Sequence, residues 1–283
     1  MKVKPPFFNK LIISCTSGIF LLGTYAHHVH TVNAAEIKAA AEEEIACVLE
    51  NIPKPQDDDC YLFIRLYSPV YKKTFSSTNF LRYCISKTDV SDYHVSHASI
   101  GFSLKDDFFS LTQTGASCVK VEHCTDISTN PYMDTCDAEK SQQIVFAVKV
   151  TREEYDRAIE LIRNSSNLSY SVLQNFVIAQ YCVERKYLTA EDEQGLDEFY
   201  RTHAKKSKQK KKLFVCSTFV AYILDNSVDR IHDFFVEKGI DYHFLTVADL
   251  AEIPGVRPLF SSSWEDYNRA AEEFASSDEN FLM

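Results

Sequence analysis

The sequence predicts an α+β fold. Three features indicate it: short apolar or alternating segments typical of strands, apolar residues at helical spacing, and two neighbouring strand segments that can pair as a hairpin. Hydrophobic residues make up 45% of the 283-residue chain and only 7 residues are Gly, which favours a packed globular protein over a fibrous or linker-rich one. The net charge of −10 excludes general nucleic-acid binding, because that function requires a basic face to neutralise phosphates.

Residues 1–34 have the composition of a targeting segment. Lys2, Lys4 and Lys10 precede an apolar stretch over 11–25, and Ala34 supplies a small residue at a candidate cleavage site. The apolar stretch is shorter than the roughly 20 residues that a membrane-spanning helix needs. The favoured interpretation is a cleaved secretory signal and the alternative is an uncleaved anchor. We therefore expect a secreted or membrane-anchored protein.

A helical and linker segment over 35–57 separates this leader from the main domain, which we place at 58–262. Residues 35–46 form a short helix rich in Ala and Glu, and the polar, Pro-containing run 53–59 marks the boundary. The first half of the domain contains one predicted helix at 79–86. Its predicted strands are Cys60–Leu66 and the hairpin pair Ser96–Phe102 and Phe108–Thr112. Residues 115–141 contain three cysteines and many polar residues and are predicted to form an inserted loop.

The second half of the domain carries clearer patterns. Residues 143–150 alternate cleanly and predict a strand, after which Thr151 and Glu154 form a capping box at the start of a helix. A second helix is predicted over 169–181. The segment 204–213 holds six lysines in ten residues and is expected to be an exposed loop, with binding to an acidic membrane surface or a localisation signal as alternatives.

The chain then turns apolar at Phe214, and a helix is expected from about Cys216. Thr246 caps a short helix that ends at Glu252, and a strand follows over 256–260. Residues 263–283 form an acidic C-terminal tail.

Nine cysteines raise the question of disulfides. Cys118, Cys124 and Cys136 are close enough in sequence for one disulfide in an oxidising compartment. Zinc is disfavoured, because their spacing lacks the tight pairs of structural zinc sites. A disulfide or plain buried thiols are favoured instead. We expect no metal and no cofactor.

Cys216 is the candidate nucleophile. It lies where strand-like residues give way to a helix, so the helix dipole and unpaired backbone N–H groups stabilise its thiolate. Many inert buried cysteines share this position, and a structural thiol is the alternative interpretation.

A thiol nucleophile needs a base, and His97 is the best candidate among nine histidines. It opens a strand whose next residues, Ala98, Ser99 and Gly101, are small enough to let a helix lie close. His94 is the nearest rival, but it precedes the strand.

Two segments together resemble a known family. Ser96-His97-Ala98-Ser99-Ile100-Gly101-Phe102 and, much later, Phe214-Val215-Cys216-Ser217-Thr218-Phe219-Val220 are similar to the motifs of the circularly permuted NlpC-type cysteine peptidases. This branch of the papain-like fold, which includes the bacterial YiiX group, places the histidine strand before the cysteine helix. Leu245-Thr246-Val247-Ala248-Asp249-Leu250 and Ile253-Pro254-Gly255 resemble its closing segment, so the resemblance covers roughly residues 61–260.

The resemblance implies a small antiparallel sheet packed against helices and a thiol hydrolase that cleaves a peptide or cell-wall amide. Cys216 would attack the carbonyl and His97 would transfer the proton. A third polar residue is expected on the strand after the histidine strand. Ser110 falls nearest, with Thr112 and Gln113 as alternatives, although none is the His, Asn or Glu that would be preferred.

Two other functions stay open. One is hydrolysis or transfer of a lipid acyl group by the same pair, and the other is a catalytically weak binding domain, which the absence of a strong third residue suggests. The expected partners are a peptide, cell-wall or lipid acyl substrate and no nucleic acid. Membrane association through the leader or the lysine loop stays an alternative.

Overall fold

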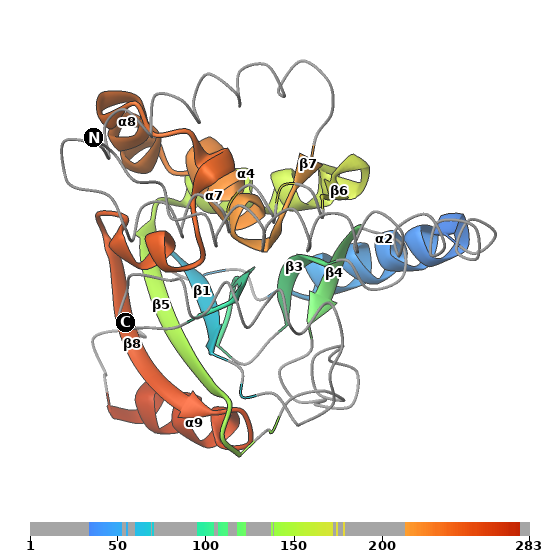
Figure 1. Cartoon of the computed structure of the whole chain (residues 1–283). Coiled ribbons are helices and arrows are strands. Elements are labelled where there is room, and N and C mark those ends of the chain that lie inside the picture. Colours follow the sequence, from blue (N-terminus) through green and yellow to red (C-terminus); the bar gives the residue numbers. More distant parts are fainter. Residues whose placement is uncertain are drawn as a thin grey trace, which may run out of the picture.

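The computed structural model describes residues 34–52, 55, 60–68, 70, 95–104, 107–112, 118–122, 137, 139–171, 174, 178 and 213–277. Its centre is a six-stranded antiparallel sheet with strand order β4-β3-β2-β1-β5-β8 (Figure 1). These strands are β1 (Cys60–Ser68), β2 (His97–Gly101), β3 (Phe108–Thr112), β4 (Cys118–Glu122), β5 (Gln142–Val150) and β8 (Val256–Ser263). A second sheet pairs β6 (Ser169–Tyr170) with β7 (Leu213–Phe214) in parallel. The fold class α+β is therefore confirmed.

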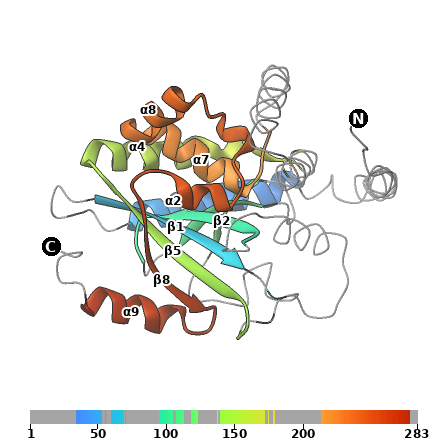
Figure 2. The same ribbon diagram turned by 60° about the vertical axis from the view of Figure 1, so that its left-hand side comes forward.

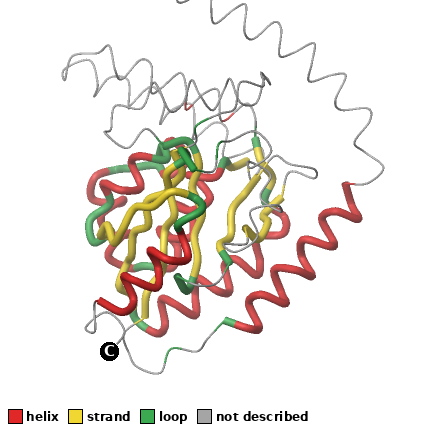
Figure 3. The backbone as a smooth tube through the Cα atoms, turned by 90° about the horizontal axis from the view of Figure 1, so that it is seen from below, coloured by secondary structure: helices red, strands yellow, loops and turns green. Residues whose placement is uncertain are grey.

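Helices cover both faces of the large sheet. The α-helices of the described residues are α2 (Ala34–Asn51), α4 (Arg152–Arg163), α7 (Cys216–Ser227), α8 (Asp229–Lys238) and α9 (Tyr267–Ser277). Short 3₁₀ helices are η2 (Asn164–Asn167), η3 (Tyr242–Phe244) and η4 (Ala248–Glu252). Figure 2 shows α4, α7 and α8 above the sheet and α9 below it, and Figure 3 shows the strands from the underside.

The alternation of side chains along β1 explains why both faces are covered. Leu62, Ile64 and Leu66 belong to the larger core, which the residues of α2, α4, α7 and α8 complete. Phe63 points to the opposite face, where Tyr267 of α9 closes a smaller core. Successive side chains of a strand point to opposite faces, so a strand that is buried along nearly its whole length must be covered on both sides.

The five predicted strands are confirmed. β1 contains the predicted strand, β2 and β3 pair antiparallel as the predicted hairpin, and β5 and β8 lie where strands were expected. The capping box is confirmed too: Thr151 Oγ1 accepts from Glu154 N at 3.2 Å, and Glu154 Oε2 accepts from Thr151 N at 2.8 Å. Thr246 Oγ1 likewise accepts from Asp249 N at 3.1 Å, just before η4.

Three sequence-based expectations were wrong in part. The segment 115–141 is not all loop, because Cys118–Glu122 forms β4 and pairs with β3 along its whole length. Val119 is buried in the larger core, and Val121 packs against it, so a short strand is stabilised within a polar segment. Ser169 and Tyr170 form β6 instead of opening a helix, because their backbone pairs with β7. Helix α2 also extends to Asn51, because Leu49 packs in the larger core.

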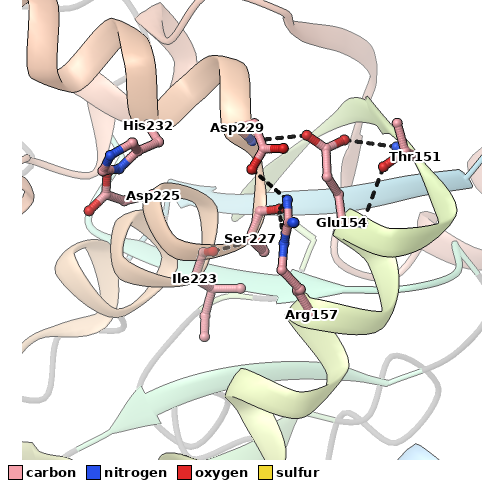
Figure 4. A network of polar contacts seen from close by, with 8 residues as sticks. All are labelled: Thr151, Glu154, Arg157, Ile223, Asp225, Ser227, Asp229 and His232. Atoms are coloured by element: carbon pink, nitrogen blue, oxygen red, sulfur yellow. Dashed lines mark hydrogen bonds and ion pairs between the residues drawn. The ribbon is translucent and has the colours of Figure 1, made fainter.

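A network of polar contacts joins α4 to the junction of α7 and α8 (Figure 4). Glu154 Oε1 accepts from Asp229 N at 2.9 Å, so this carboxylate caps the start of α8 as well as α4. Arg157 donates to Ser227 O at 2.9 Å and pairs with Asp229 at 2.6 Å. These contacts hold the end of α7 that lies farthest from Cys216.

Several predicted features lie outside the described residues: the leader up to residue 33, the helix at 79–86, the lysine loop up to residue 212, His94, Gln113, Cys84, Cys124, Cys136 and Cys182. Of the helix predicted at 169–181, the described positions beyond β6 are Ser171, Gln174 and Ile178. Within the described part of the chain, no helix has both the length and the apolar character needed to cross a membrane.

Candidate active site

Cys216 is the first residue of α7. Val215 before it is extended, with φ −122° and ψ 177°, so the chain turns abruptly from β7 into the helix. The first turn is held by two hydroxyls: Val215 N donates to Thr218 Oγ1 at 2.9 Å, and Ser217 Oγ donates to Leu245 O at 2.8 Å. Phe219 and the other apolar residues of α7 are buried in the larger core. The thiol therefore lies at the positive end of a helix whose direction is fixed by the core.

His97 opens β2 and lies next to Cys216, whose charge and side-chain hydrogen bonding help to raise the pKa of His97. Both residues are buried, with His97 4% and Cys216 6% exposed. The imidazole stacks on the ring of Tyr67, its partner on β1, with ring centroids 5.3 Å apart. The structure thus brings together the two residues that the sequence proposed as nucleophile and base.

The other side of the imidazole faces Glu122, the last residue of β4. His97 Nε2 lies 2.6 Å from Glu122 Oε1 and 3.2 Å from Ser110 Oγ. Ser110 donates its own proton to Ala98 O at 2.8 Å, so its lone pairs face the ring nitrogen. A carboxylate and a hydroxyl lone pair both accept, which means that Nε2 carries the proton. Nδ1 is therefore the ring nitrogen that is left for the Cys216 thiol.

Two further groups hold the second oxygen of this carboxylate. Tyr67 donates its hydroxyl to Glu122 Oε2 at 3.0 Å, and Arg65 donates from Nη2 at 3.3 Å. The side chains of Arg65 and Glu122 are each 1% exposed. Buried charges require partners of opposite charge, and here the carboxylate lies between two.

The electrostatics of the site favour charged forms. Burial opposes protonation of His97, but the negative charges of Glu122 and Cys216 and the hydrogen bonds to both outweigh it and raise the pKa of His97 from 6.5 to about 9. Burial would also raise the pKa of the Glu122 carboxyl, yet the charge of His97, the hydrogen bond from its ring, and Arg65 hold that pKa below its usual value. The arrangement suits an imidazolium between a thiolate and a carboxylate.

Glu122 is the residue that the sequence analysis missed. The third group was expected on the strand after the histidine strand, where Ser110 does lie beside His97, whereas Glu122 comes from the next strand along. The sequence signal that could have led to Glu122 is the alternation of Val119, Lys120 and Val121, because it indicates a strand inside a polar segment. Thr112, the other described alternative, is buried, and its hydroxyl has no hydrogen-bond partner among the described residues, so it does not orient the ring.

The remaining described histidines and cysteines have other surroundings. His232 pairs with Asp225 at 3.1 Å on the surface, and His243 pairs with Asp241 at 2.8 Å. Among the described cysteines, Cys47, Cys60, Cys118 and Cys216 are outside any disulfide. The predicted disulfide therefore does not involve Cys118.

Comparison of the chain with models of known families, with curated proteins and with solved structures yields no match. Among the described residues, no three His, Cys, Asp or Glu side chains are grouped in a way that could hold a metal ion. What the described site can do chemically rests on its own residues: a thiol at a helix start, an imidazole, and a buried carboxylate that accepts from the imidazole.

Proposed function

We propose that this chain is a cysteine hydrolase that cleaves an amide of the peptide or cell-wall type through an acyl-enzyme on Cys216. The observation that carries the proposal is the continuous buried line from Cys216 to His97 to Glu122 at the start of α7. A structural cysteine would not require a histidine on one side, and that histidine would not require a buried carboxylate on the other.

The chemistry follows from the positions of these groups. The Cys216 thiolate attacks the carbonyl carbon of the amide, and the oxyanion that forms accepts from the backbone N–H of Cys216 at the helix start. His97 donates its Nδ1 proton to the leaving amine, which breaks the C–N bond and leaves a thioester. His97 then removes a proton from water, whose oxygen attacks the thioester. The C–S bond breaks, the carboxylic acid leaves, and the Cys216 thiolate and the His97 imidazolium are restored.

The proposed fold is the permuted papain-like arrangement. The histidine strand precedes the cysteine helix by more than a hundred residues, and α7 packs against β2 and β3. The antiparallel sheet packed against helices supports this assignment at the level of architecture.

Glu122 bears on the competing functions. The idea of a catalytically weak binding domain depended on the lack of a strong third residue, and a carboxylate 2.6 Å from His97 removes that reason. Ester or lipid acyl substrates would use the same three residues, so an assay with different acyl substrates is needed to distinguish these reactions.

The test is a pH titration of the alkylation of Cys216 by iodoacetamide, followed by peptide mass spectrometry. Cys47 is an exposed thiol on α2 and serves as an internal reference in the same sample. We expect Cys216 to react with a midpoint at least about 2 pH units below the 8.5 of an ordinary thiol. A midpoint near that of an ordinary thiol would overturn the proposal.

A substrate panel then identifies the reaction. Peptides, cell-wall fragments and phospholipids are incubated with the full chain and with Cys216→Ala, and the protein is examined for a covalent acyl adduct. An adduct from an amide substrate that is absent in Cys216→Ala is the expected result. An adduct from lipid esters alone would replace the amide assignment with the lipid alternative.

A further inference from the structure

Arg65 is a buried arginine on β1 whose position the proposed reaction does not by itself explain. Its guanidinium carbon lies 4.3 Å from the ring centre of Phe108 and 4.9 Å from that of Tyr67. Two rings from the C-terminal part of the chain complete the surroundings: Trp264 at 5.5 Å and Tyr267 at 5.6 Å. We call these four rings the aromatic cage. Aromatic faces attract a cation without removing its charge, so the cage holds a charged guanidinium away from water.

The charges of the buried site balance only when Arg65 is included. In the reactive state Cys216 and Glu122 are negative, whereas His97 is positive, which leaves one uncompensated negative charge. Arg65, 3.3 Å from Glu122 Oε2, supplies the missing positive charge. An unpaired charge in a buried position is costly, so without Arg65 the site would take up a proton and the thiolate would be the group to lose its charge.

The cage depends on residues from the far end of the chain. Trp264 donates its backbone N–H to Ser141 O at 3.1 Å, and its ring lies 4.7 Å from that of Tyr67. Tyr67 in turn stacks on His97 and donates to Glu122. Tyr267, at the start of α9, donates its hydroxyl to Leu104 O at 2.9 Å. The segment after β8 is thereby packed directly behind the groups that orient the imidazole.

Glycine at position 101 allows this packing. A Cβ atom at Gly101 would lie 3.0 Å from the ring of Phe108, the closest ring to Arg65. The absence of a side chain at Gly101 therefore lets the ring of Phe108 lie against the backbone of Gly101, where it forms part of the cage.

We propose that Arg65 is a positioning residue of the active site: its guanidinium, held in the aromatic cage, keeps Glu122 ionised and directed at His97, and Trp264 and Tyr267 hold Arg65 in place. This inference rests on the proposed function and adds the C-terminal segment to the parts of the chain on which the reactivity of Cys216 depends.

The test compares the pH dependence of Cys216 alkylation in the full chain and in five variants. Arg65→Met removes the charge and keeps the length of the side chain, whereas Arg65→Lys keeps the charge. Trp264→Leu opens the cage. Arg157→Met removes an arginine whose ion pair lies at the other end of α7, and it is the control for loss of an ion pair. Cys47 again serves as the internal reference, and circular dichroism reports folding.

We expect Arg65→Met to raise the midpoint for Cys216 by about 1 pH unit, which corresponds to a roughly tenfold lower rate below the wild-type midpoint. Arg65→Lys should restore most of the reactivity, Trp264→Leu should give a shift of the same sign, and Arg157→Met should leave the midpoint where it is. Phe274→Leu, in α9 but outside the cage, is the matched control for Trp264→Leu.

The outcomes separate the two proposals. A wild-type midpoint near 8.5 overturns the proposed function itself. If the wild-type midpoint is low and Arg65→Met folds but has the same midpoint, only the role of Arg65 is overturned. If Arg65→Met does not fold, the inference is tested with Arg65→Lys and Trp264→Leu instead. A Cys216 midpoint in Trp264→Leu equal to that of the wild type would overturn the inference. Equal shifts in the control variants would also overturn it, because they would reflect general loosening.

Discussion

Glu122 Oε1 lies 2.6 Å from Nε2 of His97, although the two residues belong to strands that are separated in the sheet by β3. This contact links the last residue of β4 to the first residue of β2. Ser110 on the intervening strand is small and places its hydroxyl beside the same nitrogen instead of blocking the approach. Four predictions follow from this arrangement and from the way the helices around it are capped.

Glu122→Gln should lower the pKa of His97 and slow the reaction. The amide that replaces the carboxylate carries no charge. Its oxygen can accept a hydrogen bond from only one of His97 and Arg65, and its NH₂ group then faces the other. We expect a loss in kcat/KM of roughly 10²-fold or more, within the range of general acid–base effects. Breaking a buried ion pair should also reduce the free energy of unfolding by roughly 3 kcal/mol.

An NMR titration of isotope-labelled His97 checks this directly, because it needs no substrate. The wild-type imidazole should titrate near the pKa of about 9 that Glu122 and Cys216 impose. In Glu122→Gln the titration should move toward 6.5. An unchanged titration would show that the carboxylate does not control the imidazole.

Ser110→Ala should have a much smaller effect than Glu122→Gln. The hydroxyl is the longer of the two contacts to Nε2, at 3.2 Å, and it is uncharged. Loss of its hydrogen bonds should cost about 1 kcal/mol of stability and lower kcat/KM less than about tenfold. Comparison of both single variants and the double variant measures their coupling; a larger loss in Ser110→Ala than in Glu122→Gln would reverse the assigned roles.

Stability should depend on the protonation of His97. Its pKa is about 9 in the folded chain and near 6.5 when exposed, so the folded state binds the proton more tightly. The stabilising contribution is fully present below about pH 6.5 and is lost as the pH rises through about 9. For Glu122 the pKa is lowered by folding, so its contribution is lost as the pH falls through its folded value.

Urea unfolding of the wild type and of His97→Asn from pH 6 to pH 9.5 tests this sign. The difference in free energy of unfolding between them should shrink as the pH rises. A difference that stays constant or grows over this range would contradict the linkage, because the variant lacks the titrating imidazole.

Glu154→Ala should destabilise the fold while leaving the reactivity of Cys216 intact. The carboxylate accepts from Thr151 N and from Asp229 N, so its removal uncaps two helices. Each lost cap costs about 1 kcal/mol, and we expect a total near 2 kcal/mol in thermal or urea unfolding. Thr151→Ala, which removes one capping contact only, is the matched control and should cost about half as much. A shift in the alkylation midpoint of Cys216 in either variant would show that this network also supports the site.

The sequence by itself was enough to select Cys216 and His97 as the candidate nucleophile and base. Cys216 is a candidate because an apolar, strand-like segment changes to helical spacing at that residue, and His97 because it opens a strand of small residues. The resemblance of the two surrounding segments, in their order along the chain, to the permuted NlpC-type motifs then favoured this pair over the other cysteines and histidines. The hairpin of β2 and β3 and the cap at Thr151 were predictable for the same reason: periodicity and capping are local properties that a few neighbouring residues determine.

Only the tertiary structure identified Glu122, Arg65 and the aromatic cage. The chain has 40 acidic residues, and nothing in their spacing says which one lies beside His97. That choice depends on the pairing of β4 with β3 and on the packing of Trp264 and Tyr267 behind β1. Contacts of this kind join residues far apart in the chain, and they are decided by the register of the strands and the shape of the core, which local sequence patterns do not encode.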